Sequence, residues 1–254
     1  MMVFSLVKYV LTAAFRDKIL IAFVVLAAVG VSLSMFLGSS AMSEKDQFSA
    51  VFAAGTLRIG SFVTLILFVI FYIRKSFETR DVEYMLSRPV SRLQFLTAHS
   101  LSFSFLAFLL AVITTSVIFS MPGPQNMEGN LLWGLSLFVE LVLVSNVALF
   151  FSVVLSSSVV ATLATIAFYT LSRMIGGILG IIAAEPEGGA MLVLQKIMLL
   201  ISMIIPRFDL MGQSAWLIYG AQDSINWPFI LSQGLVFYGL VFTASYVDFK
   251  RKQF

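Results

Sequence analysis

The sequence has 254 residues, of which 59% are hydrophobic and only 11% are charged, and its net charge is +3. Soluble domains carry roughly 25% charged residues, so this composition excludes an ordinary soluble domain. The sequence contains no cysteine, which excludes disulfides and thiolate metal sites. Spans of about 20 apolar residues with short connections would fill the chain and leave no room for a soluble catalytic domain.

Long apolar runs predict an all-α integral membrane protein in which residues 1–254 form a single transmembrane domain. Apolar residues within 3–15 follow helical spacing, which suits an N-terminal amphipathic helix in the membrane interface, and an extension of the first span into the cytosol fits nearly as well. Residues 191–205 are apolar, but about 15 residues fall short of a span, so we interpret them as re-entrant or interfacial. Six spans are expected, at about 19–37, 52–73, 96–119, 131–155, 159–182 and 228–247.

Basic residues indicate how these spans are oriented. They gather before the first span, between the second and third spans, and after the last span. With six spans these three places share one side of the membrane, and the positive-inside rule assigns that side to the cytoplasm. A full crossing by residues 191–205 would put the basic C-terminal tail outside. We therefore expect six spans, with both termini in the cytoplasm.

The densest charge lies in the connection between the second and third spans, residues 74–95. Val82, Met85 and Leu86 fall on one face of a short helix, which Pro89 ends. Such a helix can lie in a groove of a partner protein, where its charges fix the register. Composition alone favours a solvated loop whose arginines only set the topology. The charged residues of this connection include Glu78, Arg80, Asp81, Glu83, Arg88 and Arg92.

Three short motifs stand beside the apolar runs. One is Leu86-Ser87-Arg88-Pro89-Val90-Ser91-Arg92, which matches the pattern Leu-x-x-Pro-Val-Ser-Arg. Phe15-Arg16-Asp17-Lys18 precedes the first span, and Ile205-Pro206-Arg207-Phe208-Asp209-Leu210 precedes the last. In this order the motifs resemble type-2, export-type permeases of ATP-binding-cassette (ABC) transporters, in the NosY-like branch. The six-span plan covers the whole chain, and His99 is one departure, since the family often has Lys there.

The resemblance implies a permease of the bacterial inner membrane that pairs with a second permease, of the same or a related chain, and with two ATPase subunits. A coupling helix would bind the ATPase groove. The sequence has no Gly-x-x-x-x-Gly-Lys-Ser/Thr motif, so ATP and Mg²⁺ would belong to the partner and this chain would not be an enzyme. Membrane lipid and a possible periplasmic partner are further expected contacts, and nothing indicates nucleic acid. The implied coupling residues are Glu78, Arg80, Asp81, Glu83, Met85, Leu86, Arg88, Pro89 and Arg92.

Three ionisable residues interrupt the apolar runs: Arg58, Glu140 and Arg173. Charges in a membrane cost about 2.5–3.5 kcal/mol by insertion scales, so they usually face a bundle interior or water. Glu140 and Arg173 each lie about nine residues from the outer end of adjacent spans, which predicts an ion pair roughly 13 Å deep. We expect a structural clamp, with a place on a substrate path as the alternative. Arg58 is expected to snorkel to the outer surface.

Three functions stay open at this point. The first is an exporter driven by a separate ATPase, whose substrate could be a lipid, peptide, drug, glycan or maturing cofactor. The second is a subunit that transmits ATPase motion to a periplasmic process without moving a substrate. The third is an ion-coupled secondary transporter, which predicts acidic residues near the midplane and two similar halves, and only Glu140 meets that expectation. An intramembrane enzyme would need paired catalytic groups, and no metal-ligand set is visible in the sequence.

Overall fold

The structure is a computed structural model that describes residues 2–40, 44–79, 82, 91–122, 126–184, 189–220 and 227–251. Its regular elements within these residues are all helical. Six helices, α2, α3, α5, α6, α7 and α10, are long and apolar enough to cross a membrane, which confirms the predicted all-α fold and the predicted number of helices of spanning length. The helices are α1 (Met2–Arg16), α2 (Ile19–Ser39), α3 (Lys45–Glu78), α5 (Arg92–Phe119), α6 (Met127–Val154), α7 (Ser158–Ala184), α8 (Gly189–Ile204), α9 (Trp216–Tyr219) and α10 (Trp227–Arg251), with a 3-10 turn η1 (Phe208–Leu210).

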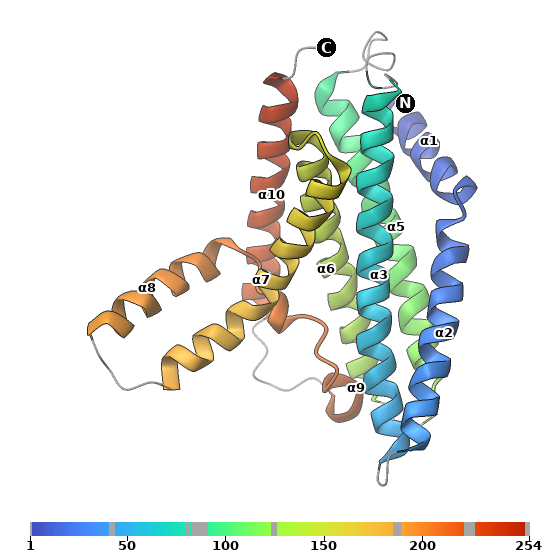
Figure 1. Cartoon of the computed structure of the whole chain (residues 1–254), viewed down its shortest axis with the longest axis vertical. Coiled ribbons are helices and arrows are strands. Elements are labelled where there is room, and N and C mark those ends of the chain that lie inside the picture. Colours follow the sequence, from blue (N-terminus) through green and yellow to red (C-terminus); the bar gives the residue numbers. More distant parts are fainter. Residues whose placement is uncertain are drawn as a thin grey trace.

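Helix α6 forms the centre of the bundle. It contacts α3, α5, α7, α9 and α10 (Figure 1), and 67% of its most apolar window is buried. The same measure is 22% for α2, which packs mainly against α3 and leaves side chains such as Val29 and Phe36 exposed. The outer helices therefore turn apolar side chains outward, as contact with lipid requires, while α6 and α3 both contribute many residues to the core.

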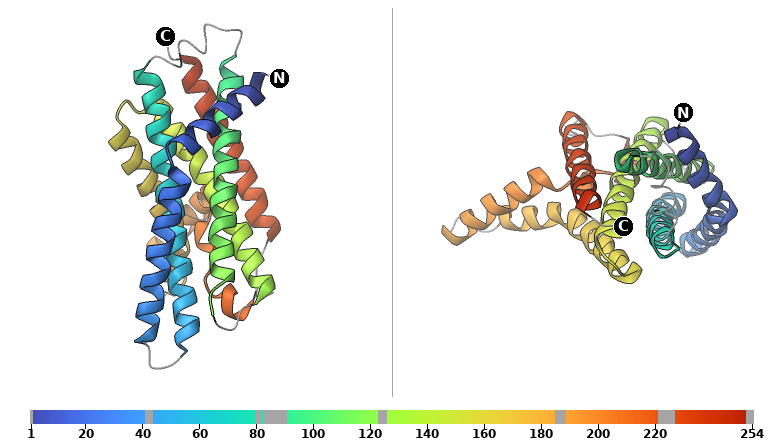
Figure 2. Two further views of the ribbon diagram at one scale, coloured as in Figure 1. Left: turned by 90° about the vertical axis from the view of Figure 1, so that its right-hand side faces the viewer. Right: turned by 90° about the horizontal axis from the view of Figure 1, so that it is seen from above.

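The start of α1, the end of α3, the start of α5 and the end of α10 lie at the same end of the bundle (Figures 1 and 2). We call this the terminal end. Helix α1 crosses the bundle obliquely here and packs on α5 through a stripe of small and apolar residues that includes Val10 and Ala14. Phe4 and Phe15 are exposed on its other face. Lys18 adopts a left-handed conformation, with φ of 55°, where the chain turns from α1 into α2.

Helices α7 and α8 form a hairpin that projects sideways from the bundle (Figures 1 and 2). Helix α8 has 16 residues and exposes apolar side chains such as Leu200 and Met203. After α8 the chain turns back toward α6. Residues 205–215, which we call the inserted loop, pack against the middle of α6, and α9 continues to the α6 N-terminus, where Asn126 N donates to Leu217 O. The segment 191–205 is thus part of a short helix outside the six long ones.

Candidate functional site

Most of the predicted coupling residues lie outside the described part of the chain. These are Arg80, Asp81, Glu83, Met85, Leu86, Arg88 and Pro89. Helix α3 continues to Glu78 and α5 begins at Arg92, so the connection is shorter than the predicted 74–95. Val82 is 1% exposed and belongs to the buried core. This member of the predicted apolar edge therefore faces its own chain.

The two flanks of the charged connection meet the end of α10. Arg92 Nη1 donates to Phe249 O at 2.7 Å and to Lys250 O at 2.6 Å, which satisfies carbonyl groups that a helix end leaves without intrahelical partners. The Phe249 ring stacks on Phe95 with centroids 5.3 Å apart and meets the edge of Phe77 at 6.4 Å. We call this group, Phe77, Arg92, Phe95 and Phe249, the terminal clamp. It joins α3, α5 and α10 at one buried side chain.

Helix α5 has a well-defined start at the end of the Leu-x-x-Pro-Val-Ser-Arg motif. Ser91 has extended backbone geometry, and its hydroxyl accepts a bond from Gln94 N at 3.2 Å. Gln94 Oε1 in turn accepts from Ser91 N at 3.0 Å, which completes a capping box. The Ser of the motif therefore fixes where α5 begins, and the following Arg92 fixes that start against α10.

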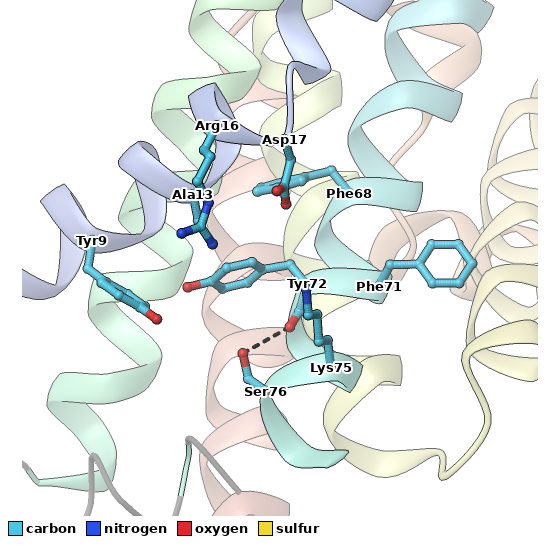
Figure 3. A pocket seen from close by; sticks show the side chains of 9 residues that line it. All are labelled: Tyr9, Ala13, Arg16, Asp17, Phe68, Phe71, Tyr72, Lys75 and Ser76. Carbon is cyan, nitrogen blue, oxygen red and sulfur yellow. Dashed lines mark hydrogen bonds between the residues drawn. The ribbon is translucent and has the colours of Figure 1, made fainter. Parts of the chain in front are cut away.

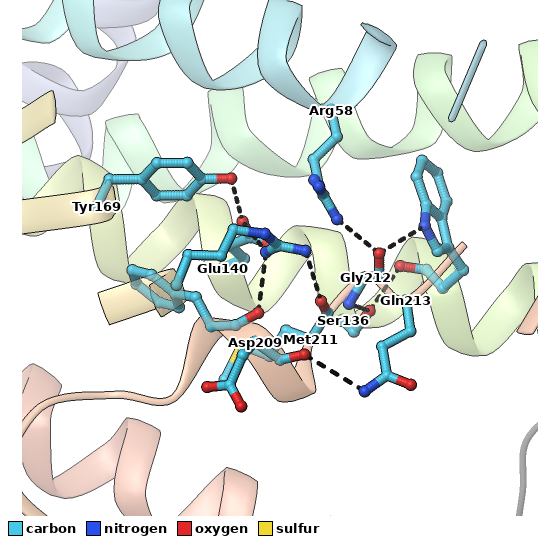
Figure 4. A network of polar contacts seen from close by, with 11 residues as sticks. Arg58, Ser136, Glu140, Tyr169, Asp209, Met211, Gly212 and Gln213 are labelled. Carbon is cyan, nitrogen blue, oxygen red and sulfur yellow. Dashed lines mark hydrogen bonds and ion pairs between the residues drawn. The ribbon is translucent and has the colours of Figure 1, made fainter. Parts of the chain in front are cut away.

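The intramembrane charges form a network at the middle of α6 (Figure 4). Arg173 Nη1 lies 3.2 Å from Glu140 Oε1, so the predicted ion pair is present. The Tyr169 hydroxyl, one turn before Arg173 on α7, donates to the same oxygen at 2.7 Å. Glu140 is 1% exposed and lies 13 residues after Met127, at the middle of α6, because α6 begins four residues before the predicted span.

Both intramembrane arginines bind backbone carbonyl groups of the inserted loop. Arg173 donates to Phe208 O at 2.9 Å and to Met211 O at 3.3 Å. Arg58 Nη1 donates to Gly212 O at 2.7 Å, so the expectation that it snorkels outward is wrong. The reason is that the inserted loop brings a carbonyl acceptor to Arg58 inside the bundle. Trp133 Nε1 also donates to Gly212 O, at 3.2 Å.

Non-helical backbone inside a membrane protein needs such partners. Without water, each unsatisfied backbone group costs several kcal/mol, so irregular segments occur there only where protein satisfies them. Gly212 has a positive φ of 58°, which a residue without a Cβ adopts at little cost. Its N–H donates to Ser136 Oγ at 2.9 Å, and a Cβ there would lie 3.4 Å from both Arg58 Nη1 and Glu140 Oε2. The loop backbone therefore passes between the two charged groups.

Helix α10 holds the first part of the inserted loop through Gln233. Its amide nitrogen donates to Ser202 O and, at 3.0 Å, to Ile205 O, while its oxygen accepts from Arg207 N at 3.2 Å. Gln233 is 6% exposed, so these bonds replace water for three backbone groups. Local sequence patterns contain no signal for this role, because the partners lie 26 to 31 residues away on another element.

A second ion pair lies within the inserted loop, between Arg207 Nη2 and Asp209 Oδ2 at 2.6 Å. It packs against Gly176 of α7, where any Cβ would collide with the Asp209 carboxylate. The Gly176 and Gly180 spacing resembles a helix-packing motif, but Gly176 admits a loop side chain and Gly180 has open space around it. Gly176 therefore makes room for a side chain of the inserted loop and not for the close approach of a second helix.

The charges of the network do not cancel. Arg58, Arg173 and Arg207 oppose Glu140 and Asp209, which leaves one excess positive charge when all five are ionised. The described residues contain no group of three or more potential metal ligands. The network acts through charge pairing and hydrogen bonding. These interactions hold the backbone of the inserted loop in place.

No protein-family model matches this chain, and no curated protein is significantly similar to it. An assignment of function therefore depends on the motifs, the six long helices, the terminal clamp and the contacts of the inserted loop.

Proposed function

We propose that this chain is the transmembrane permease subunit of an ABC transporter and exports a substrate with ATP hydrolysed by a separate ATPase. The observation that carries the proposal is the junction of the charged connection with α10. The connection contains the Leu-x-x-Pro-Val-Ser-Arg motif, and both of its flanks contact Phe249. A force applied to this connection by an ATPase would reach α10 through the contacts of its two flanks with Phe249.

The terminal end is the cytoplasmic side in this proposal. Basic residues flank α2, α3, α5 and α10 at that end, as the positive-inside rule requires. Helix α1 would lie in the inner interface of a bacterial inner membrane, with its exposed aromatic side chains toward lipid. Helix α8, the inserted loop and α9 would form a re-entrant segment that enters from the outer side and returns to it.

Helix α10 would transmit movement from the terminal clamp to the inserted loop. Phe249 and Gln233 are 16 residues apart on this helix, which corresponds to about 24 Å. Movement of the terminal clamp would displace Gln233, and with it the backbone at residues 202–207. The inserted loop would then shift against Arg58 and Arg173. This gives a path of direct contacts from the ATPase side to the middle of the membrane.

A second permease subunit would complete the transporter, since the pathway of such exporters would lie between two permeases. The side chains that face outward on α2 and on the α7–α8 hairpin are available to lipid or to that subunit. An ion-coupled secondary transporter has less support. Glu140, the acidic residue near the middle of the membrane, is bound to Arg173 and Tyr169, as expected for a structural carboxylate.

The proposal is tested by copurifying the chain in detergent with the ATPase encoded nearest to it. A variant with Glu83→Lys and Arg88→Glu should abolish a stable complex, because it reverses charge on the proposed docking segment. The matched control, Glu128→Lys with Lys196→Glu, reverses the same number of charges on exposed residues away from the terminal end. A folded wild-type chain that binds no ATPase would refute the proposal. Equal loss of the complex in the control would refute the docking site.

A further inference from the structure

A pocket of about 160 Å³ lies at the terminal end between α1 and α3, beside the turn from α1 into α2 (Figure 3). The Arg16 guanidinium and the hydroxyls of Tyr9 and Tyr72 point toward the same space. Lys75 also lines the pocket, from the last turn of α3. Two cations and two phenol groups thus converge at one place that is separate from the terminal clamp and from the intramembrane network.

The cations of this pocket are available for a ligand. Within the described residues, the ion pairs are those of Arg173 with Glu140 and of Arg207 with Asp209. Arg16 and Lys75 therefore have no carboxylate within ion-pairing distance in that part of the chain. Asp17 also lines the pocket, so its side chains carry a net charge of +1. This charge matches a ligand with a single negative charge.

The position of the pocket indicates where such a ligand comes from. Its α3 residues, from Phe68 to Ser76, lie about 3 to 15 Å along the helix axis from the end of α3. With the end of α3 placed at the membrane surface, this stretch crosses the boundary between headgroups and hydrocarbon, which lies about 5–7 Å below that surface. Phe71 lines the pocket and is 54% exposed, so an apolar surface continues outward from the charged groups. A phosphate attached to acyl chains would satisfy both surfaces.

We propose that this pocket binds the phosphodiester headgroup of an anionic phospholipid from the leaflet at the terminal end. Arg16 offers two parallel donors to phosphate oxygens, and Lys75 adds a second positive charge. The Tyr9 hydroxyl donates to the headgroup, and the rings of Phe68 and Phe71 contact the glycerol and the first acyl carbons. The negative charge of Asp17 offsets one of the two positive charges, so the pocket suits a ligand with a single negative charge. The site does not depend on coupling to an ATPase.

The test uses the full chain in detergent with phosphatidylglycerol, phosphatidylcholine or inorganic phosphate. Lipid affinity is measured from the shift in unfolding temperature, and retained lipid is identified by native mass spectrometry. Phosphatidylglycerol should stabilise the protein more than phosphatidylcholine, because the two lipids share the phosphate but differ in net charge. Each of Arg16→Gln and Lys75→Gln should weaken phosphatidylglycerol binding about fivefold, as expected for one basic residue near a membrane surface.

The matched control is Lys8→Gln with Lys18→Gln, which removes two charges from α1 and the adjacent turn without touching the pocket. Unchanged affinity in both pocket variants, or an equal loss in the control, would overturn the proposal. Equal stabilisation by inorganic phosphate would overturn the lipid as its source. Asp17→Asn keeps both cations and should tighten phosphatidylglycerol binding, so it provides a test if the pocket variants do not fold. Unchanged or weaker binding in Asp17→Asn would count against the site.

Discussion

The terminal clamp and the intramembrane network use the same chemistry in two environments. Arg92 donates to Phe249 O and Lys250 O at the end of α10, and Arg173 donates to Phe208 O and Met211 O in the inserted loop. The carbonyl groups of the first pair belong to a helix end near the solvent. Those of the second belong to irregular backbone in the bundle interior, where Arg173 is held by the buried carboxylate of Glu140.

The difference follows from the cost of charge away from water. A guanidinium at the terminal end keeps part of its hydration, so binding two carbonyl groups is sufficient. Inside the bundle, unsatisfied backbone and unpaired charge are both expensive, so donor and counter-charge are needed together. The inserted loop therefore depends on Arg58, Arg173 and Glu140. Removing any one of these side chains should leave a buried charge or a backbone group without its partner and so destabilise the fold. The terminal clamp should tolerate change better.

The largest effect is expected for Glu140→Ala. This change leaves Arg58 and Arg173 without their buried carboxylate, and removal of one partner of a buried pair costs about 3–5 kcal/mol. Exchange of Glu140 and Arg173 should restore the attraction but not the bonds to Phe208 O and Met211 O, so stability should recover in part. Thermal unfolding in detergent measures both. If the exchange variant recovers no stability, the hydrogen bonds of Arg173 to the inserted loop contribute more to stability than its ion pair with Glu140.

Gln233→Leu should have the next largest effect. It removes the partners of Ser202 O, Ile205 O and Arg207 N, and a buried unsatisfied polar group costs about 1–3 kcal/mol. Limited proteolysis should then cleave within residues 202–212 faster than in the wild type. Ser232→Leu is the control, because Ser232 is the neighbouring, exposed residue of α10. Similar cleavage rates for wild type and Gln233→Leu would show that α10 does not hold the inserted loop.

A smaller effect is expected for Gly212→Ala. A residue with a Cβ pays about 1–2 kcal/mol in the left-handed region, and the new methyl group would stand between Arg58 and Glu140. Gly177→Ala is the control, because Gly177 is helical and has open space around it. It should be neutral or slightly stabilising, since Ala has a higher helix propensity than Gly. Equal destabilisation in both variants would show that the left-handed conformation of Gly212 does not require glycine.

Local sequence patterns predict the parts of this molecule that depend on neighbours along the chain. The six long helices follow from runs of apolar residues, and the pair of Glu140 and Arg173 follows from the short connection between α6 and α7, which sets both at a similar depth. Capping of α5 by Ser91 and Gln94 is also local, three residues apart.

Contacts made by the inserted loop could not be predicted in this way. Arg58 meets Gly212 across 154 positions, and no periodicity indicates that the chain turns back into the bundle after α8. Without that turn, an arginine near the end of an apolar run has only the surface to reach, which is why snorkelling was expected. The need for a glycine at position 176 is equally invisible to local patterns, since Asp209 is its neighbour only in three dimensions.

Arg92→Gln gives the smallest expected loss of stability and separates the two regions most directly. Arg92 is partly exposed, so loss of its bonds to Phe249 O and Lys250 O should cost only about 1 kcal/mol. In the proposed complex, stimulation of the ATPase by substrate should fall more strongly, because the connection loses its hydrogen bonds to the end of α10. Arg251→Gln, at the exposed end of the same helix, is the control for charge. If Arg92→Gln lowers stability and coupling in proportion, the terminal clamp only supports the fold, and a loss of coupling at nearly full stability would assign it to force transmission.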